Sequence, residues 1–245
     1  MTYRVANPPD SEIVWCIQLY QSNPTQCLAY LRTVYSGSRI VLLMDGDVEN
    51  LQRYQVLSRQ FRTELIVGDH LMTSSTCHRY VDRLLQQALT GPERYFFRID
   101  PDTRVWKRFT WLPTFDCAFG TLETVTQAFA DRVPHPPNIQ GGCIGLTRGC
   151  IEGVLASDNL THDRCVLQAT TGWARTQDCR HILSKESMFD DFLISWSVDA
   201  AGFPIIQHPE IASYWRVALQ NTDLRFAVTH PHKEMEFFPT VIGQG

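Results

Sequence analysis

The 245-residue sequence lacks several features that would each indicate a particular class of protein. None of its eight cysteines forms a C-x-x-C pair, which argues against a structural zinc site. Its longest apolar runs are well short of the roughly 20 residues that a membrane-spanning helix needs. The net charge is −4 and no long basic run occurs, which argues against nucleic acid as a partner.

The chain also opens without the pattern of a secretory leader. Its first residues, MTYRVANPPDSE, are polar and contain proline. The cysteines are therefore expected as buried free thiols in a reducing compartment, and not as a disulfide framework. These observations predict a cytoplasmic protein with no transmembrane segment.

Over the first hundred residues, apolar runs alternate with segments of helical periodicity. We expect strands over 12–20, 39–48, 63–69 and 95–99, and helices over 25–35, 49–61 and 75–89. Thr25 is the expected N-cap of the first helix. Such alternation builds an α/β fold in which a mostly parallel central sheet has helices on both faces.

The rest of the chain has a different composition. It contains many glycines, tryptophans and turn signals such as HPPN and AAGFP, and fewer clean helices. No flexible linker separates it from the first part. We therefore expect one domain over 1–245, with one half up to about residue 104 and a more irregular half over about 105–245.

An acidic turn ends the last of the predicted strands in the first half. The apolar run YFFRI stops at Asp100-Pro101-Asp102, and ligands of such sheets gather at the carboxyl ends of the strands. Two carboxylates at positions i and i+2 can face one hard cation, such as Mn²⁺ or Mg²⁺. The alternative is a plain turn or helix cap, which Asp and Pro also favour.

Three further motifs follow along the chain. A glycine pair, Gly141-Gly142, lies in IQGGCIGLTRG; an acidic pair, Asp190-Asp191, opens the apolar segment DDFLISW; and His230 lies in FAVTHPHK. Each has a plain structural alternative: a turn or bulge for the glycines, a helix cap for the acids, and a structural or surface role for the histidine.

The order of these motifs resembles the GT-A fold of nucleotide-sugar-dependent glycosyltransferases, and within it the Fringe-like β-glycosyltransferases. In that family an N-terminal α/β half leads to an acidic triplet at a strand end. A Gly-Gly segment, an Asp-Asp helix and a C-terminal histidine then follow. The resemblance spans residues 12–233, and it departs from the family at Pro101, where Fringe-like enzymes have a third aspartate.

The resemblance implies a reaction and the groups that carry it out. A divalent cation, Mn²⁺ or Mg²⁺, would be held by Asp102, Asp100 and His230, and would bind the diphosphate of a nucleotide sugar, with UDP as the expected nucleotide. Asp191, with Asp190 as second choice, would take the proton of an acceptor hydroxyl on a glycan, peptide or small molecule. The sugar would be transferred with inversion.

Other residues would contact the nucleotide or the sugar. The expected nucleotide contacts are Tyr20, Asn23, Asp45, Asp47, Arg79, Asp82, Asp100 and Lys233. Gly141 and Gly142 would allow a bound sugar to approach the backbone closely.

Two other classes of function are compatible with the same residues. An Mg²⁺-dependent nucleotidyltransferase could use the acidic turn, but such enzymes usually carry a glycine-rich loop after the first strand, and QLYQSNPTQ contains no glycine. A non-catalytic sugar-binding or scaffold protein could keep the fold without the reaction.

Overall fold

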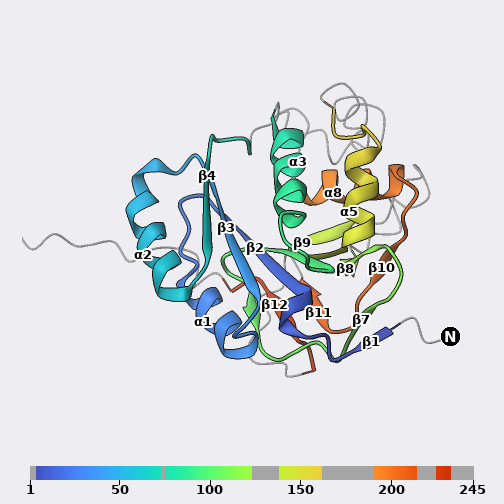
Figure 1. Cartoon of the computed structure of the whole chain (residues 1–245), viewed down its shortest axis with the longest axis horizontal. Coiled ribbons are helices and arrows are strands. Elements are labelled where there is room, and N and C mark those ends of the chain that lie inside the picture. Colours follow the sequence, from blue (N-terminus) through green and yellow to red (C-terminus); the bar gives the residue numbers. More distant parts are fainter. Residues whose placement is uncertain (1–3, 73–75, 123–137, 162–189, 214–224, 233–245) are drawn as a thin grey trace, which may run out of the picture.

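The computed structural model describes residues 4–72, 76–122, 138–161, 190–213 and 225–232 (Figure 1). Its centre is a seven-stranded sheet. In spatial order the strands are β10 (Ile205–Gln207), β8 (Ala118–Leu122), β9 (Ile139–Thr147), β5 (Tyr95–Ile99), β2 (Ile13–Leu19), β3 (Arg39–Asp45) and β4 (Glu64–Gly68). Within this sheet only β9 runs opposite to the others. The expected α/β architecture with mostly parallel strands is therefore confirmed.

Helices cover both faces of the sheet. One face packs against α1 (Thr25–Val34) and α2 (Leu51–Phe61). The other packs against α3 (Cys77–Ala88), α5 (Arg148–Ala156) and α8 (Asp190–Ala200), which stand together in Figure 1. The alternation of side chains along β2 accounts for the two layers, because Trp15 and Ile17 face α1 and α2 while Val14 and Cys16 face the other three helices. None of the helices in the described parts of the chain is long and apolar enough to cross a membrane.

Two small sheets complete the structure. One pairs β1 (Arg4–Ala6) with β7 (Trp111–Pro113). The other contains β11 (Ile211–Ser213), β12 (Val228–His230) and β6 (Arg104–Val105), in that order. Because β6 begins two residues after Asp102, its pairing with β12 brings a segment from near residue 230 beside the acidic turn.

Most boundaries in the first half lie within one or two residues of the expected ones, and two differences have a local cause. The helix expected over 25–35 begins at Thr25 itself, with Pro24 as its N-cap, so the expectation that Thr25 caps it is wrong. The strand expected over 39–48 ends at Asp45, because the chain turns at Gly46 with a φ of +74°. A short 3-10 helix, η2 (Val48–Asn50), then precedes α2, and another, η1 (Asp10–Glu12), precedes β2.

The second half is more regular than its composition indicates. It supplies β8, β9 and β10 to the central sheet, together with α5 and α8. The nine-residue β9 contains three glycines, IQGGCIGLT, and glycine is a poor strand former that hides the alternating pattern. The two parts of the chain therefore share one sheet.

Candidate metal centre

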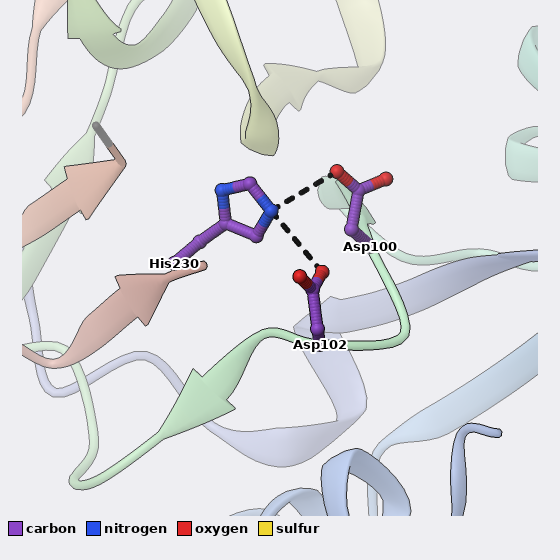
Figure 2. A group of neighbouring side chains, drawn as sticks. All are labelled: Asp100, Asp102 and His230. Atoms are coloured by element: carbon purple, nitrogen blue, oxygen red, sulfur yellow. Dashed lines mark ion pairs between the residues drawn. The ribbon is translucent and has the colours of Figure 1, made fainter. Parts of the chain in front are cut away.

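Two carboxylates and one imidazole converge at the carboxyl end of β5 (Figure 2). Asp100 and Asp102 come from the turn after β5, and His230 is the last residue of β12. The Nε2 atom of His230 lies 3.1 Å from Oδ1 of Asp102 and 3.3 Å from Oδ2 of Asp100. Asp102 and His230 are buried, whereas the side chain of Asp100 is 27% exposed. The structure thus brings together the three residues expected as metal ligands.

Backbone hydrogen bonds fix the acidic turn on its neighbours. The amide of Asp100 and the hydroxyl of Thr103 both donate to the carbonyl of Gly142 on β9, at 3.3 and 2.8 Å. The amide of His232 donates to the carbonyl of Asp102 at 2.9 Å. The turn is therefore held from two sides, by β9 and by the segment that carries His230.

The geometry fits a hexacoordinate cation. One ligand atom from each of the three residues can be chosen so that all lie within 4.8 Å of one another. Two ligands about 2.1 Å from an octahedral ion and at right angles to each other are about 3.0 Å apart. The distances of 3.1 and 3.3 Å from the imidazole to the carboxylates are close to that value. The group could therefore hold a metal ion and leave positions for other ligands.

The charges of the group also favour a cation. Burial raises the pKa of Asp100, and the nearby Asp102 adds to this effect, while Arg98 and His230 oppose it. Two carboxylates that face the same imidazole nitrogen favour a positive charge between them, which a metal ion ligated by Nε2 would supply.

Arg98 connects this group to the acidic pair of α8. Its guanidinium lies 2.8 Å from Oδ1 of Asp100 and 2.7 Å from Oδ2 of Asp190, and it also donates to Gln18 Oε1 and to the Gly141 carbonyl. Burial alone would lower the pKa of Arg98, but these carboxylates outweigh burial and raise it. Arg98 was not predicted as a site residue; the available signal was a cation inside the apolar run YFFRI.

The acidic pair occupies the first turn of α8, and its two members differ. Asp190 is buried against Arg98. Asp191 is only partly buried, and its Oδ1 accepts a hydrogen bond from the amide of Phe192 at 2.7 Å. Burial and the neighbouring Asp190 raise the pKa of Asp191 to about 7. Asp191 is thus a carboxylate that can take or give a proton near neutral pH, whereas Asp190 is tied up in an ion pair.

The glycine pair lies between these two groups. A Cβ atom on Gly141 would come within 3.1 Å of Asp191 Oδ2, and one on Gly142 would lie 2.0 Å from Nδ1 of His230. Both glycines therefore make room for protein side chains of the site, on opposite sides of β9. That the glycines make room for protein side chains was not predicted from the sequence. That they also allow a sugar to approach the backbone stays a prediction.

Asp45 and Asp47 have structural partners. Asp45 is fully buried, accepts hydrogen bonds from the amides of Leu71 and Met72 at 2.6 and 3.1 Å, and lies 2.7 Å from Nδ1 of His70. Asp47 accepts from the amide of Gln21 and the hydroxyl of Tyr54 at 2.7 and 2.6 Å, and from the Asn50 amide. These contacts hold the loops that follow β2 and β4.

The other expected nucleotide contacts are spread over the same edge of the sheet. Tyr20 is 46% exposed and stacks on His70, with ring centroids 4.8 Å apart. Asn23 accepts hydrogen bonds from the amide and hydroxyl of Thr25 at the start of α1. Tyr20 and Asn23 thus contact residues of the loops after β2 and β4 and the start of α1.

The remaining residues differ in their exposure and in their contacts. Arg79 is exposed on α3, and Asp82 on the same helix accepts a hydrogen bond from Gln86. His232, two residues after His230, has its Nε2 2.8 Å from Thr229 Oγ1 and does not belong to the three-residue group. Lys233 lies outside the described residues.

Comparison with known proteins leaves the site to be interpreted from its own geometry. No protein-family model matches the chain, and no curated protein matches it.

Proposed function

We propose that the chain is a metal-dependent glycosyltransferase that moves a sugar from a nucleotide-sugar donor, with UDP as the expected nucleotide, to an acceptor hydroxyl with inversion. The observation that carries the proposal is the convergence of Asp100, Asp102 and His230 at a strand end, with the half-buried carboxylate of Asp191 beside the same glycine pair.

Each residue has a role that its surroundings support. A cation held by Asp100, Asp102 and His230 would neutralise charge that develops on the departing nucleotide diphosphate. Asp191 would accept the proton of the acceptor hydroxyl, a role that a pKa near 7 suits. Asp190 and Arg98 would hold the start of α8 and the orientation of Asp100.

The order of the motifs along the chain supports the same proposal. The acidic turn, the glycine pair, the acidic pair and the C-terminal histidine follow one another as in GT-A glycosyltransferases, and the described structure brings all of them within one connected set of contacts. An accidental turn at Asp100-Pro101-Asp102 would not need a histidine from more than a hundred residues later in the sequence.

The two alternative functions make different demands on the structure. A nucleotidyltransferase would need a phosphate-binding loop near the first strand, and the segment between β2 and α1 contains no glycine. A non-catalytic sugar-binding protein would need no carboxylate with a raised pKa beside the cation group, whereas Asp191 is one.

Donor turnover tests the proposal. The purified chain is incubated with a panel of nucleotide sugars, with Mn²⁺ and with a chelator, and release of the nucleoside diphosphate is measured. We expect Mn²⁺-dependent release from at least one UDP-sugar. Mn²⁺-dependent binding of UDP without turnover of any donor would favour the binding protein, and release of pyrophosphate from nucleoside triphosphates would favour the nucleotidyltransferase.

A further inference from the structure

Ser213 and His230 face each other across two paired strands. They are register partners in the parallel pairing of β11 with β12, and Ser213 Oγ lies 3.1 Å from Nδ1 of His230. Ser213 is completely buried and His230 nearly so. The hydroxyl therefore contacts the imidazole on the side opposite to Asp100 and Asp102.

The direction of this hydrogen bond depends on what Nε2 holds. An imidazole that ligates a cation through Nε2 carries its remaining proton on Nδ1, and a buried N–H group needs an acceptor. Ser213 Oγ is in position to be that acceptor. If Ser213 donated to Nδ1 instead, the proton would lie on Nε2 and would point at the carboxylates, where it would exclude a metal ion.

The surroundings keep the pair together. A Cβ atom on Gly142 would lie 2.5 Å from Ser213 Oγ and 2.0 Å from His230 Nδ1, so β9 closes over the pair only because glycine stands there. The amide of Ser213 donates to Thr121 Oγ1 at 2.9 Å, and that hydroxyl donates to the carbonyl of Ile211. Strands β8, β9 and β11 thus all fix the position of Ser213.

We propose that Ser213 is a positioning residue of the metal centre: its hydroxyl accepts the Nδ1–H of His230 and so presents the Nε2 lone pair to a divalent cation. The inference rests on the proposed metal centre, because it assigns a role in metal binding to a residue that does not itself touch the metal. Partners of this kind orient a ligating histidine and raise its basicity, and their loss typically costs about 10- to 100-fold in metal affinity.

Binding of Mn²⁺ alone, measured from the electron paramagnetic resonance signal of the free ion, tests the proposal without any activity. We expect Ser213→Ala to weaken Mn²⁺ binding by about 10- to 100-fold. The matched control is Ser197→Ala, which removes another fully buried serine hydroxyl, one that donates to the Ile194 carbonyl within α8. The control is expected to bind Mn²⁺ as the parent does.

Repeating the substitution in a His230→Ala protein separates an effect on the orientation of the histidine from a general effect on packing. In His230→Ala, the further change Ser213→Ala should not alter the Mn²⁺ affinity, because the hydroxyl has no imidazole to orient. Equal Mn²⁺ affinities of Ser213→Ala and the parent would overturn the inference, as would an equal loss in both backgrounds. Should Ser213→Ala fail to fold, Ser213→Cys replaces the hydroxyl with a slightly larger group that is a weaker acceptor, and it is expected to weaken Mn²⁺ binding in the same direction. A parent that binds no Mn²⁺ would instead refute the metal centre itself.

Discussion

Two strand ends of the central sheet carry the same pattern of two aspartates separated by one residue. Asp45-Gly46-Asp47 begins with the last residue of β3, and Asp100-Pro101-Asp102 follows β5; both strands are direct neighbours of β2. Three of these four carboxylates are buried, and Asp100 is partly so. The two motifs have the same spacing in the sequence, but their carboxylates have different neighbours in the structure.

The difference lies in what the carboxylate oxygens face. Around Asp45 and Asp47 they face amide and hydroxyl donors and the Nδ1 atom of His70, which stabilise the carboxylates without an added ion. Asp100 and Asp102 each direct one oxygen at the same imidazole nitrogen, and the other oxygen of Asp100 pairs with Arg98. The carboxylates of Asp45 and Asp47 accept hydrogen bonds that hold loops in place. Those of Asp100 and Asp102 point toward a common position, where a cation is favourable. The partners, more than the D-x-D spacing, therefore distinguish a structural acidic turn from a candidate site.

The largest expected effect comes from breaking the converging motif. Asp102→Ala removes a ligand outright, so Mn²⁺-dependent binding of UDP should weaken by more than about 100-fold, beyond the range seen for losing an outer partner. Calorimetric titration of UDP in the presence of Mn²⁺ measures the change. The matched control is Asp116→Asn, an exposed aspartate whose oxygen contacts Thr147 near the start of α5. Undiminished binding by Asp102→Ala would show that the metal assignment is wrong.

The next effect concerns chemistry without binding. Asp191→Asn keeps the size of the side chain but removes the basic oxygen, so kcat should fall by roughly 10²-fold, with little change in donor affinity. Steady-state kinetics with a UDP-sugar donor checks both quantities.

Asp190→Asn is the matched comparison within the same turn. Because it removes one carboxylate from the buried pair with Arg98, it should destabilise the fold by about 3 kcal/mol, with a smaller loss of kcat than Asp191→Asn. The reverse ranking of the two kcat values would move the role of base to Asp190. Full activity of both single variants and of the double variant would remove the acidic pair from the mechanism.

Substitution in Asp45-Gly46-Asp47 should lower stability and leave Mn²⁺ binding unchanged, the opposite of what is expected for Asp100-Pro101-Asp102. Asp47→Ala leaves the amide of Gln21 without its acceptor and removes the shorter hydrogen bond of the Tyr54 hydroxyl, which also faces the Ser22 carbonyl; the loss should cost about 1–3 kcal/mol of unfolding free energy. Urea denaturation measures this cost. The Mn²⁺ affinity of the variant should match that of the parent, and a loss of Mn²⁺ binding equal to that of Asp102→Ala would erase the distinction between the two motifs.

Much of the fold could be read from the sequence, because the first half is built from strong local patterns. The strand expected over 95–99 ends where predicted, and the helix expected over 75–89 forms over Cys77–Ala88 with Leu84 and Leu85 buried in the core. The regularity of the second half was underestimated, since β9 is stabilised by its neighbours on both edges and not by the strand propensity of its residues.

The candidate site could be predicted only as far as its motifs are local. The acidic turn and the acidic pair are visible in the sequence, and the resemblance supplied His230. Arg98 and Ser213 could not be assigned, because their importance arises from pairings across the sheet, Arg98 with Asp190 and Ser213 with His230. The same limit explains why Asp47 was expected at a nucleotide: its donors come from segments that no local pattern connects.

The last prediction concerns the pH dependence that a raised pKa of Asp191 implies. Burial, Asp190 and, more weakly, Asp100 raise its pKa to about 7 from an ordinary value of 3.8, while Arg98 and the Phe192 amide oppose the shift. Only the ionised carboxylate can accept a proton, so kcat of the parent should fall about tenfold per pH unit below pH 7. Between these two pKa values the folded state binds a proton that the unfolded state has lost, so the parent should lose stability relative to Asp191→Asn as pH rises. Rate profiles and urea denaturation of both chains between pH 5 and pH 8 measure the two trends. If kcat of parent and variant fell in the same way below pH 7, the pH dependence would belong to another group. Asp191 would then not be the proton acceptor.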